Sequence, residues 1–308
     1  MGTGYSITLL TLPADQTREN LQTAIDDRLA AINRVMSTYD PQSELSQFNR
    51  SDRTGPIPAS PELRTVLSAA LELSRISQGA FDATVAPLVN LWGFGPGAGE
   101  DRLPTDDEID QARNRVGFER IQVDDSAGAI RKTRPDVIVD LSAIAKGYAV
   151  DQIGDYLESL GASDYLVEIG GELRLKGNNP RGESWSIAIE KPVAGERSIK
   201  RIVQISDKGM ATSGDYRNFF EIDGQRYSHA IDPDTGRPVR HTLASVTVLA
   251  DNCMLADGWA TALLVLGPDA GRALAEQQQL AALFIVITPQ GFEEQPTTAF
   301  QPYLSSTR

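Results

Sequence analysis

The sequence predicts an α+β fold in which antiparallel or mixed sheets are flanked by helices. Apolar residues recur at helical spacing in several segments, for instance between residues 17 and 35. Short alternating segments separated by turn residues are concentrated after residue 164. One of them, FFEIDGQRYSHAI, carries Asp223-Gly224 between two alternating halves, which is typical of a β-hairpin. Hairpins mixed with helices favour α+β over a parallel α/β fold.

The first eighty residues contain one predicted strand and two predicted helices. Residues 1–12 have the composition of a strand, and the apolar positions of residues 17–35 predict a helix. The passage 37–58 is polar and rich in turn formers, so we expect mainly turns there. A second helix is expected over 61–76, with Ser60 as its N-cap and proline in the first helical position.

The middle of the chain alternates irregular and regular segments. Glycine and proline are too frequent in 91–104 for regular structure. Thr105 and Glu108 then form a predicted capping box at the start of a short acidic helix. Paired strands are expected at 119–123 and 128–132. The apolar stretch 138–141 is expected as a short strand that ends in an aspartate and leads into a helix ending near Gly161.

The last part of the chain is predicted to consist mainly of strands. They are expected at 164–169, 172–176, 185–190, 200–206, 243–250 and 283–288. A helix over 255–266 and a second one after it separate the last two strands. No internal repeat marks a boundary, so the prediction is one domain over residues 1–308 with two lobes.

Composition restricts the classes of function. With 41% hydrophobic residues the chain belongs to the globular class, and it contains no apolar run long enough to span a bilayer. Its 29 basic and 42 acidic residues give a net charge of −13, which disfavours bulk nucleic-acid binding. An anionic ligand must therefore be held by local cations, backbone N–H groups or a metal. The single cysteine, Cys253, excludes an intramolecular disulfide and a cysteine-rich metal site.

Several common catalytic patterns are absent or incomplete. The glycine-rich run GFGPGAG is not followed by a helix within a β-α-β unit, so we interpret it as a structural loop and not as a dinucleotide-binding loop. The two histidines, His229 and His241, are too few for a histidine-built metal site, and neither GxSxG nor a P-loop occurs. Any catalysis must therefore depend mainly on carboxylates and backbone groups.

Two short clusters could bind an anion and a cation. In the first, Asp140 is followed by small residues and Lys146 near a helix start, which could face a phosphate; an aspartate N-cap with a solvated lysine is the structural alternative. In the second, Asp257 and Thr261 are four residues apart, so both oxygens lie on one helix face and could bind a hard cation. A capping aspartate and a back-bonded threonine are the alternative there.

Three further features are weaker signals. His229 stands near the end of a predicted hairpin strand, where it could accept a proton or be simply buried. Tyr39 lies just beyond a helix end, where a planar ligand could stack on it. The aromatic and proline-rich run 79–95 has the composition of a core-lining segment.

Taken in order, these clusters resemble the ApbE family of FAD:protein FMN transferases from end to end. Eight segments carry the resemblance: Met1-Gly2-Thr3, MSTYDPQSELSQFN, GAFDATVAPLVNLWGFGP, VDLSAIAKGYAVD, Ile169-Gly170-Gly171-Glu172, ATSGDYRNFF, YSHAIDPDTGRPV and ADGWATAL. The resemblance implies an ApbE-like fold, which is not a Rossmann fold, with the FAD site between two lobes. At position 230 the chain has alanine where the family often has a larger aliphatic residue.

The resemblance also implies roles for individual residues. The side chains of Asp257 and Thr261 and the main-chain oxygen of Ala143 would bind Mg²⁺. Tyr39 would stack on the isoalloxazine, and Met1 would line the flavin pocket. The remaining contacts with FAD would come from Ala80, Phe81, Asp82, Asp140, Lys146 and Ile231. His229 occupies the position of a catalytically important histidine in the family, and the proton of the acceptor could leave to His229 or to Asp257.

The activity implied is transfer of the FMN half of FAD to a threonine hydroxyl of another protein, with release of AMP. Hydrolysis of FAD to FMN and AMP, or FAD binding without catalysis, are the alternatives. The resemblance implies that the acceptor is a membrane redox subunit. The family is commonly periplasmic and often lipid-anchored, so we expect a periplasmic location, although the sequence shows no signal segment or lipobox cysteine.

Overall fold

The computed structural model describes residues 2–96, 102–192, 199–215, 218–222 and 224–304. The chain divides into two compact units, which are described separately. Unit 1 comprises Met1–Leu29, Lys146–Arg217 and His241–Arg308, and unit 2 comprises Ala30–Ala145 and Asn218–Arg240. The domain and lobe organisation expected from the sequence stays a prediction.

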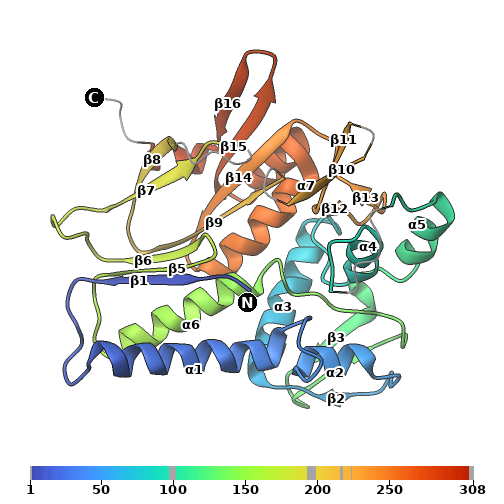
Figure 1. Cartoon of the computed structure of the whole chain (residues 1–308), viewed down its shortest axis with the longest axis horizontal. Helices are drawn as coiled ribbons and strands as arrows, with labels where there is room; N and C mark the ends of the chain where they lie inside the picture. The colour runs from blue at the N-terminus through green and yellow to red at the C-terminus, as the bar shows by residue number, and fades with distance from the viewer. Residues whose placement is uncertain (1, 97–101, 193–198, 216–217, 223, 305–308) are drawn as a thin grey trace. The chain divides into compact units, whose positions relative to one another are not determined.

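Unit 1 is built on an antiparallel sheet of seven strands (Figure 1). Every neighbouring pair in this sheet is antiparallel, so the antiparallel form of the predicted sheet is the one observed. The strand order is β1 (Tyr5–Leu9), β5 (Tyr165–Ile169), β6 (Glu172–Lys176), β9 (Lys208–Gly214), β14 (Leu243–Ala250), β15 (Ala281–Thr288) and β16 (Gly291–Pro296). A separate ribbon pairs β7 (Trp185–Glu190) with β8 (Ile199–Ile205).

Two helices of unit 1 position the candidate site. Helix α6 (Ala145–Ser159) follows the short apolar stretch 138–141 in the sequence. Helix α7 (Cys253–Gln277) packs against β9 and β14. The long helix α7 is interrupted at Gly267, whose φ of 80° is non-helical, so the two successive helices predicted from the sequence are confirmed. Asn252 caps α7 by accepting a hydrogen bond from the N–H of Leu255.

Unit 2 contains short helices, one small sheet and two hairpins. Its helices are α2 (Glu44–Arg50), α3 (Pro61–Ile76), α4 (Ala86–Leu91), α5 (Asp106–Arg113) and the 3₁₀ turn η1 (Phe118–Arg120). The sheet order is β2 (Ile57–Pro58), β4 (Ala129–Lys132), β3 (Ile121–Asp124), and the hairpins are β10 (Phe219–Ile222) with β11 (Gln225–Ser228) and β12 (Ile231–Asp232) with β13 (Arg237–Pro238). Helix α1 (Arg18–Met36) begins in unit 1 and ends in unit 2, and the 3₁₀ turn η2 (Thr298–Tyr303) ends the described chain of unit 1.

Local signals in the sequence placed several elements correctly. Ser60 caps α3 with proline in its first turn, and Thr105 and Glu108 form both bonds of the capping box of α5. The alternating segments around Gly224 pair as the predicted hairpin. These outcomes confirm the α+β prediction and reflect interactions between residues close in sequence.

Two expectations were wrong. The passage 37–58 contains α2, which Ser43 caps by accepting the N–H of Ser46. Residues 138–141 form no strand, because the side chain of Asn49 bonds to both the N–H and the carbonyl of Val139, at 2.8 Å each, in place of a neighbouring strand. The strands β9 and β16 were not predicted either. In the described part of the chain, no helix has both the length and the apolar character needed to cross a lipid bilayer.

Candidate active site

The candidate site of unit 1 lies where the first turns of α6 and α7 meet. Asp257, in the second turn of α7, is only 3% exposed. Its Oδ2 accepts a hydrogen bond of 3.0 Å from the backbone N–H of Gly147, in the first turn of α6. Its Oδ1 lies 3.9 Å from Nζ of Lys146. Asp257 therefore does not cap its own helix, as the structural alternative proposed, but caps α6 instead.

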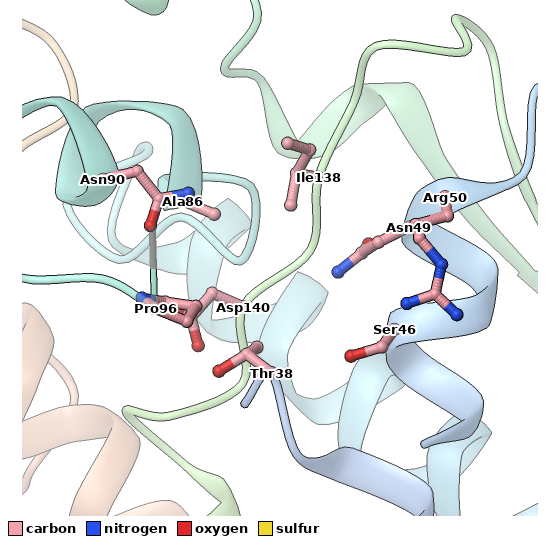
Figure 2. Close-up of a pocket in the computed structure, with 9 residues that line it drawn as sticks. All are labelled: Thr38, Ser46, Asn49, Arg50, Ala86, Asn90, Pro96, Ile138 and Asp140. Atoms are coloured by element: carbon pink, nitrogen blue, oxygen red, sulfur yellow. The ribbon is translucent and has the colours of Figure 1, made fainter. Parts of the chain in front are cut away.

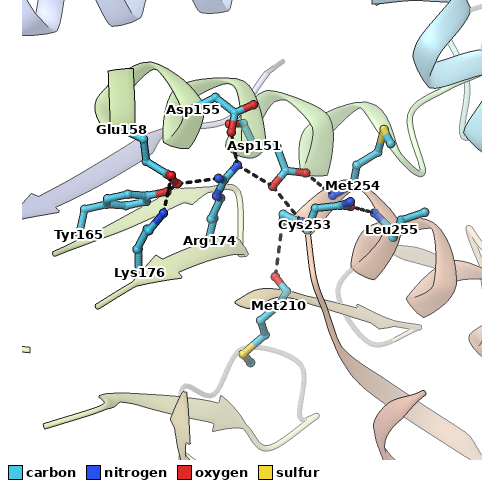
Figure 3. Close-up of polar contacts among 11 residues, drawn as sticks. Asp151, Asp155, Glu158, Tyr165, Arg174, Lys176, Met210, Cys253, Met254 and Leu255 are labelled. Atoms are coloured by element: carbon cyan, nitrogen blue, oxygen red, sulfur yellow. Dashed lines mark hydrogen bonds and ion pairs between the residues drawn. The ribbon is translucent and has the colours of Figure 1, made fainter. Parts of the chain in front are cut away.

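A second carboxylate makes the reverse connection. Asp151 of α6 accepts hydrogen bonds from the N–H groups of Cys253 at 2.9 Å and Met254 at 2.8 Å, both in the first turn of α7 (Figure 3). Each helix thus receives at its N-terminus a carboxylate from the other helix, where backbone donors and the helix dipole favour negative charge. We call this arrangement the reciprocal cap.

Two glycines allow the backbones to approach closely at the reciprocal cap. A Cβ atom on Gly147 would lie 2.3 Å from the carbonyl oxygen of Cys253. A Cβ atom on Gly209 of β9 would lie 2.3 Å from the backbone nitrogen of Cys253. Both distances are far below van der Waals contact, so neither position has room for a side chain. The position of Cys253, and of the start of α7, is thereby fixed against α6 and β9.

An ion-pair network continues along the same face of α6, toward its C-terminal end (Figure 3). Arg174 of β6 donates to the carbonyl of Asp151 at 3.0 Å, to Asp155 at 2.8 Å and to Glu158 at 2.7 Å. Glu158 also accepts from Tyr165 of β5 and pairs with Lys176. These contacts attach α6 to the sheet strands that also carry Glu172.

Lys146 is held by two buried carboxylates. Its Nζ forms an ion pair with Oε1 of Glu172, which is 4% exposed, and also faces Asp257. The alternative of a solvated lysine is therefore wrong. Burial raises the pKa of Asp257 to about 7 despite the opposing effect of Lys146, and burial likewise raises the pKa of Glu172. Although burial lowers the pKa of Lys146, the two carboxylates raise it above its ordinary value.

The oxygens present suit a hard cation. Oε2 of Glu172 is buried and has no hydrogen-bond partner among the described residues. Thr261 lies one helical turn after Asp257, and its hydroxyl is 3.3 Å from that of Ser213 in β9. A carboxylate and a hydroxyl on one helix face are the donor types that Mg²⁺ accepts. The described residues contain no group of three or more His, Cys, Asp or Glu side chains placed to hold a metal, so further ligands would be main-chain, substrate or water oxygens.

Unit 2 contains a cavity of about 170 Å³ (Figure 2). Its lining residues are Thr38, Ser46, Asn49, Arg50, Ala86, Asn90, Pro96, Ile138 and Asp140. Of these, Asp140 is a predicted site residue. Its Oδ1 accepts from the N–H of Ser142 at 2.8 Å and from the hydroxyl of Ser142 at 2.5 Å, so it closes a turn before α6 and does not cap the helix directly.

The predicted flavin-lining residues of unit 2 differ in exposure. Tyr39 is 69% exposed, so its ring is accessible for stacking. Phe81 is buried, and both oxygens of Asp82 are occupied by bonds from the N–H and hydroxyl of Thr84 and the N–H of Phe118. Contacts from this segment to a flavin would therefore come from its main chain or from Ala80. Burial raises the pKa of Asp82.

His229 stands at the end of a row of aromatic rings in unit 2. Ring centroids are 5.7 Å apart for Trp92 and Tyr227, 5.2 Å for Tyr227 and Phe220, 5.4 Å for Phe220 and Phe94, and 6.3 Å for Phe94 and His229. Nδ1 of His229 lies 3.0 Å from the carbonyl oxygen of Asn218. In the neutral ring, this bond places the proton on Nδ1 and the lone pair on Nε2.

The remaining predicted residues are placed as follows. Lys146, Asp257 and Thr261 lie in unit 1, whereas Tyr39, Asp140, Ala143, His229 and the segment from Ala80 to Asp82 lie in unit 2. Ile231 of β12 is buried in unit 2 beside Trp92 and Tyr227. Met1 lies outside the described residues. The roles assigned to these residues stay predictions.

Sequence reasoning missed four residues that shape the site. Asp151, Gly147, Glu172 and Ser213 each occur inside a segment that carried the family resemblance. The spacing of Gly147 and Asp151, four apart on one face of α6, was a signal that could have been used. No local pattern indicates that Glu172 pairs with Lys146, because that contact depends on β6 lying beside α6.

Comparisons with known proteins identify the family of the chain. The family model described as "ApbE family" matches residues 1–284. The chain is 48% identical to the FAD:protein FMN transferase of Vibrio cholerae, over 99% of this chain and 91% of that protein, and 40% identical to that of Salmonella typhimurium, over 100% and 88%. The solved flavin transferase ApbE from Vibrio cholerae superposes with a TM-score of 0.92 at 47% identity, covering 99% of this chain and 96% of that one.

A second solved structure gives the same result. The apo form of the Pseudomonas stutzeri flavinyl transferase ApbE superposes with a TM-score of 0.89 at 39% identity, covering 99% of this chain and 94% of that chain. Similarity of this extent concerns the whole fold and not one motif. The chain therefore belongs to the ApbE family.

Proposed function

We propose that this chain is an FAD:protein FMN transferase. It transfers the FMN moiety of FAD to a threonine hydroxyl of a target protein and releases AMP, in a reaction that depends on Mg²⁺. Membership of the ApbE family and the activity named for its Vibrio cholerae and Salmonella typhimurium relatives support this proposal. The observation that carries it is the buried carboxylate of Asp257, set beside Lys146 and one helical turn before Thr261.

The residues present fit a divalent cation. Asp257 and Thr261 would hold it by their side chains and Ala143 by its main-chain oxygen, and the unpartnered oxygen of Glu172 indicates that the site lacks positive charge. When bound, such a cation would supply neutralisation of the charge that develops on the diphosphate in phosphoryl transfer. The reciprocal cap keeps the carboxylate of Asp257 in a fixed position, because it holds Asp257 against the first turn of α6.

The protein's own side chains would complete the reaction. Lys146 would contact a phosphate of FAD, since a flexible ammonium next to a helix start suits that ligand. His229 would accept the proton of the threonine hydroxyl at Nε2, because its Nδ1 proton is directed to the carbonyl of Asn218. We assign the base to His229 over Asp257, whose two oxygens already face Gly147 and Lys146.

The acceptor and the location belong to the same proposal. The acceptor would be a membrane redox subunit that carries the modified threonine, and the reaction would take place in the periplasm. Both follow from the family resemblance, and both are tested by finding which protein receives the flavin.

The decisive experiment incubates the protein with FAD, Mg²⁺ and a purified candidate acceptor. Intact-mass analysis of the acceptor should show one added FMN, and chromatography should show an equal amount of AMP. The Asp257→Asn variant should retain the fold, since an amide oxygen can still accept from Gly147, and should lose about a hundredfold or more of the transfer rate. Release of free FMN and AMP without an adduct on any acceptor would instead identify a hydrolase.

A further inference from the structure

Lys146 is shared by two buried carboxylates of unit 1. Its Nζ is ion-paired to Oε1 of Glu172 and lies 3.9 Å from Oδ1 of Asp257. Both acids are almost fully buried, whereas the lysine side chain is one-third exposed, at 33%. Lys146 is thus the most accessible member of the three, and its flexible side chain can move away from Asp257 while it stays paired with Glu172.

The cluster has too little positive charge. Two carboxylates face one ammonium, and the described residues offer no partner to Oε2 of Glu172. A buried carboxylate oxygen without a partner is costly, so such atoms commonly mark the place of an absent ligand. When Glu172 is ionised, this oxygen can only accept, so a cation or a hydrogen-bond donor would satisfy it.

We propose that Lys146 is a tethered cation that competes with a divalent cation for Asp257 when FAD is absent. On binding of the divalent cation, Lys146 leaves Asp257, is retained by Glu172, and pairs with the diphosphate of FAD. Metal and FAD therefore bind cooperatively. This inference rests on the proposed function for the identity of the two ligands.

The physical reason is the exchange of partners. A divalent cation at Asp257 repels the ammonium of Lys146, and the interaction between charges about 4 Å apart is strong near a protein interior. The diphosphate offers Lys146 a new anionic partner and relieves that repulsion. Each ligand therefore raises the affinity for the other, and the two factors must be equal by thermodynamic linkage. Glu172 weakens the competition between Lys146 and the divalent cation for Asp257, because it offers Lys146 a second carboxylate partner.

The test measures Mn²⁺ binding to the FAD-free protein, by electron paramagnetic resonance of the free ion. Lys146→Met removes the competitor and should tighten Mn²⁺ binding by about tenfold. Glu172→Gln leaves Lys146 with Asp257 alone and should weaken Mn²⁺ binding severalfold. Lys176→Met is the matched control, because it removes a lysine from the ion pair with Glu158 in the same unit, and it should leave Mn²⁺ affinity unchanged.

The same titrations repeated with saturating FAD measure the coupling. The gain in Mn²⁺ affinity caused by FAD should be largest in Glu172→Gln, intermediate in the wild type and smallest in Lys146→Met. If Lys146→Met does not fold, the comparison of Glu172→Gln with the wild type still tests the inference, because the gain in Mn²⁺ affinity should be larger in Glu172→Gln. Weaker Mn²⁺ binding in both variants, or equal coupling in all proteins, would overturn the inference. No acceptor protein is present in these titrations, so they measure the coupling of metal and FAD independently of FMN transfer. The coupling can be absent in a protein that transfers FMN, and it can be present in a protein that does not.

Discussion

The proposed role of His229 as a base is supported by one hydrogen bond of its ring. The carbonyl oxygen of Asn218 accepts a hydrogen bond from Nδ1 of the neutral ring, which favours the tautomer with its lone pair on Nε2. The ring also packs edge-on against Phe94, the last ring of the aromatic row. A backbone carbonyl and an aromatic ring therefore both help to orient the histidine.

Replacing His229 by Asn tests this role. The variant should slow the single-turnover rate of transfer by about 10²–10⁴-fold, the usual contribution of a positioned base, and change the dissociation constant of FAD much less. Rapid-quench measurement of AMP and fluorescence titration of FAD separate the two effects. An unchanged single-turnover rate would remove His229 from the chemistry.

Asp151 gives a prediction for the pH dependence of stability. Burial raises the pKa of Asp151 from its ordinary value of 3.8 to about 6, although the N–H groups of Cys253 and Met254 lower it. Because the folded state holds this proton more tightly than the unfolded state, the stabilising contribution is present below the unfolded pKa and is lost as pH rises to about 6.

Asp151→Asn provides the comparison. The free energy of unfolding of the wild type minus that of the variant should decrease by at most roughly 3 kcal/mol between pH 4 and pH 6. Urea unfolding at several pH values measures this difference. A difference that instead rises with pH would show that the two backbone bonds and Arg174 outweigh burial.

At the scale of the elements, the contact of α6 with α7 determines where Asp257 lies. The reciprocal cap fixes the two helices along their axes, and Gly147 sets their separation. Overpacking a close backbone contact forces the backbones apart, since neither carbonyl nor helix can yield as a flexible side chain does.

Gly147→Ala should therefore destabilise the protein by about 1–3 kcal/mol and reduce FMN transfer, because Asp257 loses its bond to the first turn of α6. Gly55→Ala is the control: no atom lies within 4 Å of its added Cβ, and its backbone is not in the left-handed region. Thermal unfolding and transfer assays on both variants check this expectation. Equal behaviour of the two variants would contradict the close contact.

The elements predicted correctly are those with local signals. Ser60, the Thr105–Glu108 box and the turn at Gly224 act on residues a few positions away, so sequence alone contained their causes. The missed features depend on distant partners. Val139 is extended but bonds to Asn49, 90 residues away, and β9 is a strand because β6 and β14 lie beside it.

At the scale of the molecule, the predicted site residues are divided between the two units. The side chains predicted to bind the cation, and Lys146, belong to unit 1, whereas Tyr39, Asp140 and His229 belong to unit 2. The order of eight segments in the sequence was sufficient to indicate the family. It did not indicate the acid–lysine–acid cluster, because Glu172 and Lys146 are brought together by the packing of α6 on the sheet.

Ligand binding should stabilise the molecule in two steps. FAD should raise the melting temperature, and Mg²⁺ added with FAD should raise it further, since a ligand at 100 times its dissociation constant adds about 2.7 kcal/mol. A chelator should remove the second step and leave the first. Differential scanning fluorimetry of the wild type and Asp257→Asn measures both, and a second step retained in Asp257→Asn would place the metal elsewhere.

The reciprocal cap also constrains how the protein loosens. If the first turn of α6 frays, Asp257 of α7 loses the N–H of Gly147; if the first turn of α7 frays, Asp151 of α6 loses the N–H groups of Cys253 and Met254. Neither turn can therefore open without breaking a hydrogen bond to the other helix. The amides of both turns should therefore exchange their hydrogens through one common opening, as a single cooperative unit that contains the carboxylates of Asp151 and Asp257.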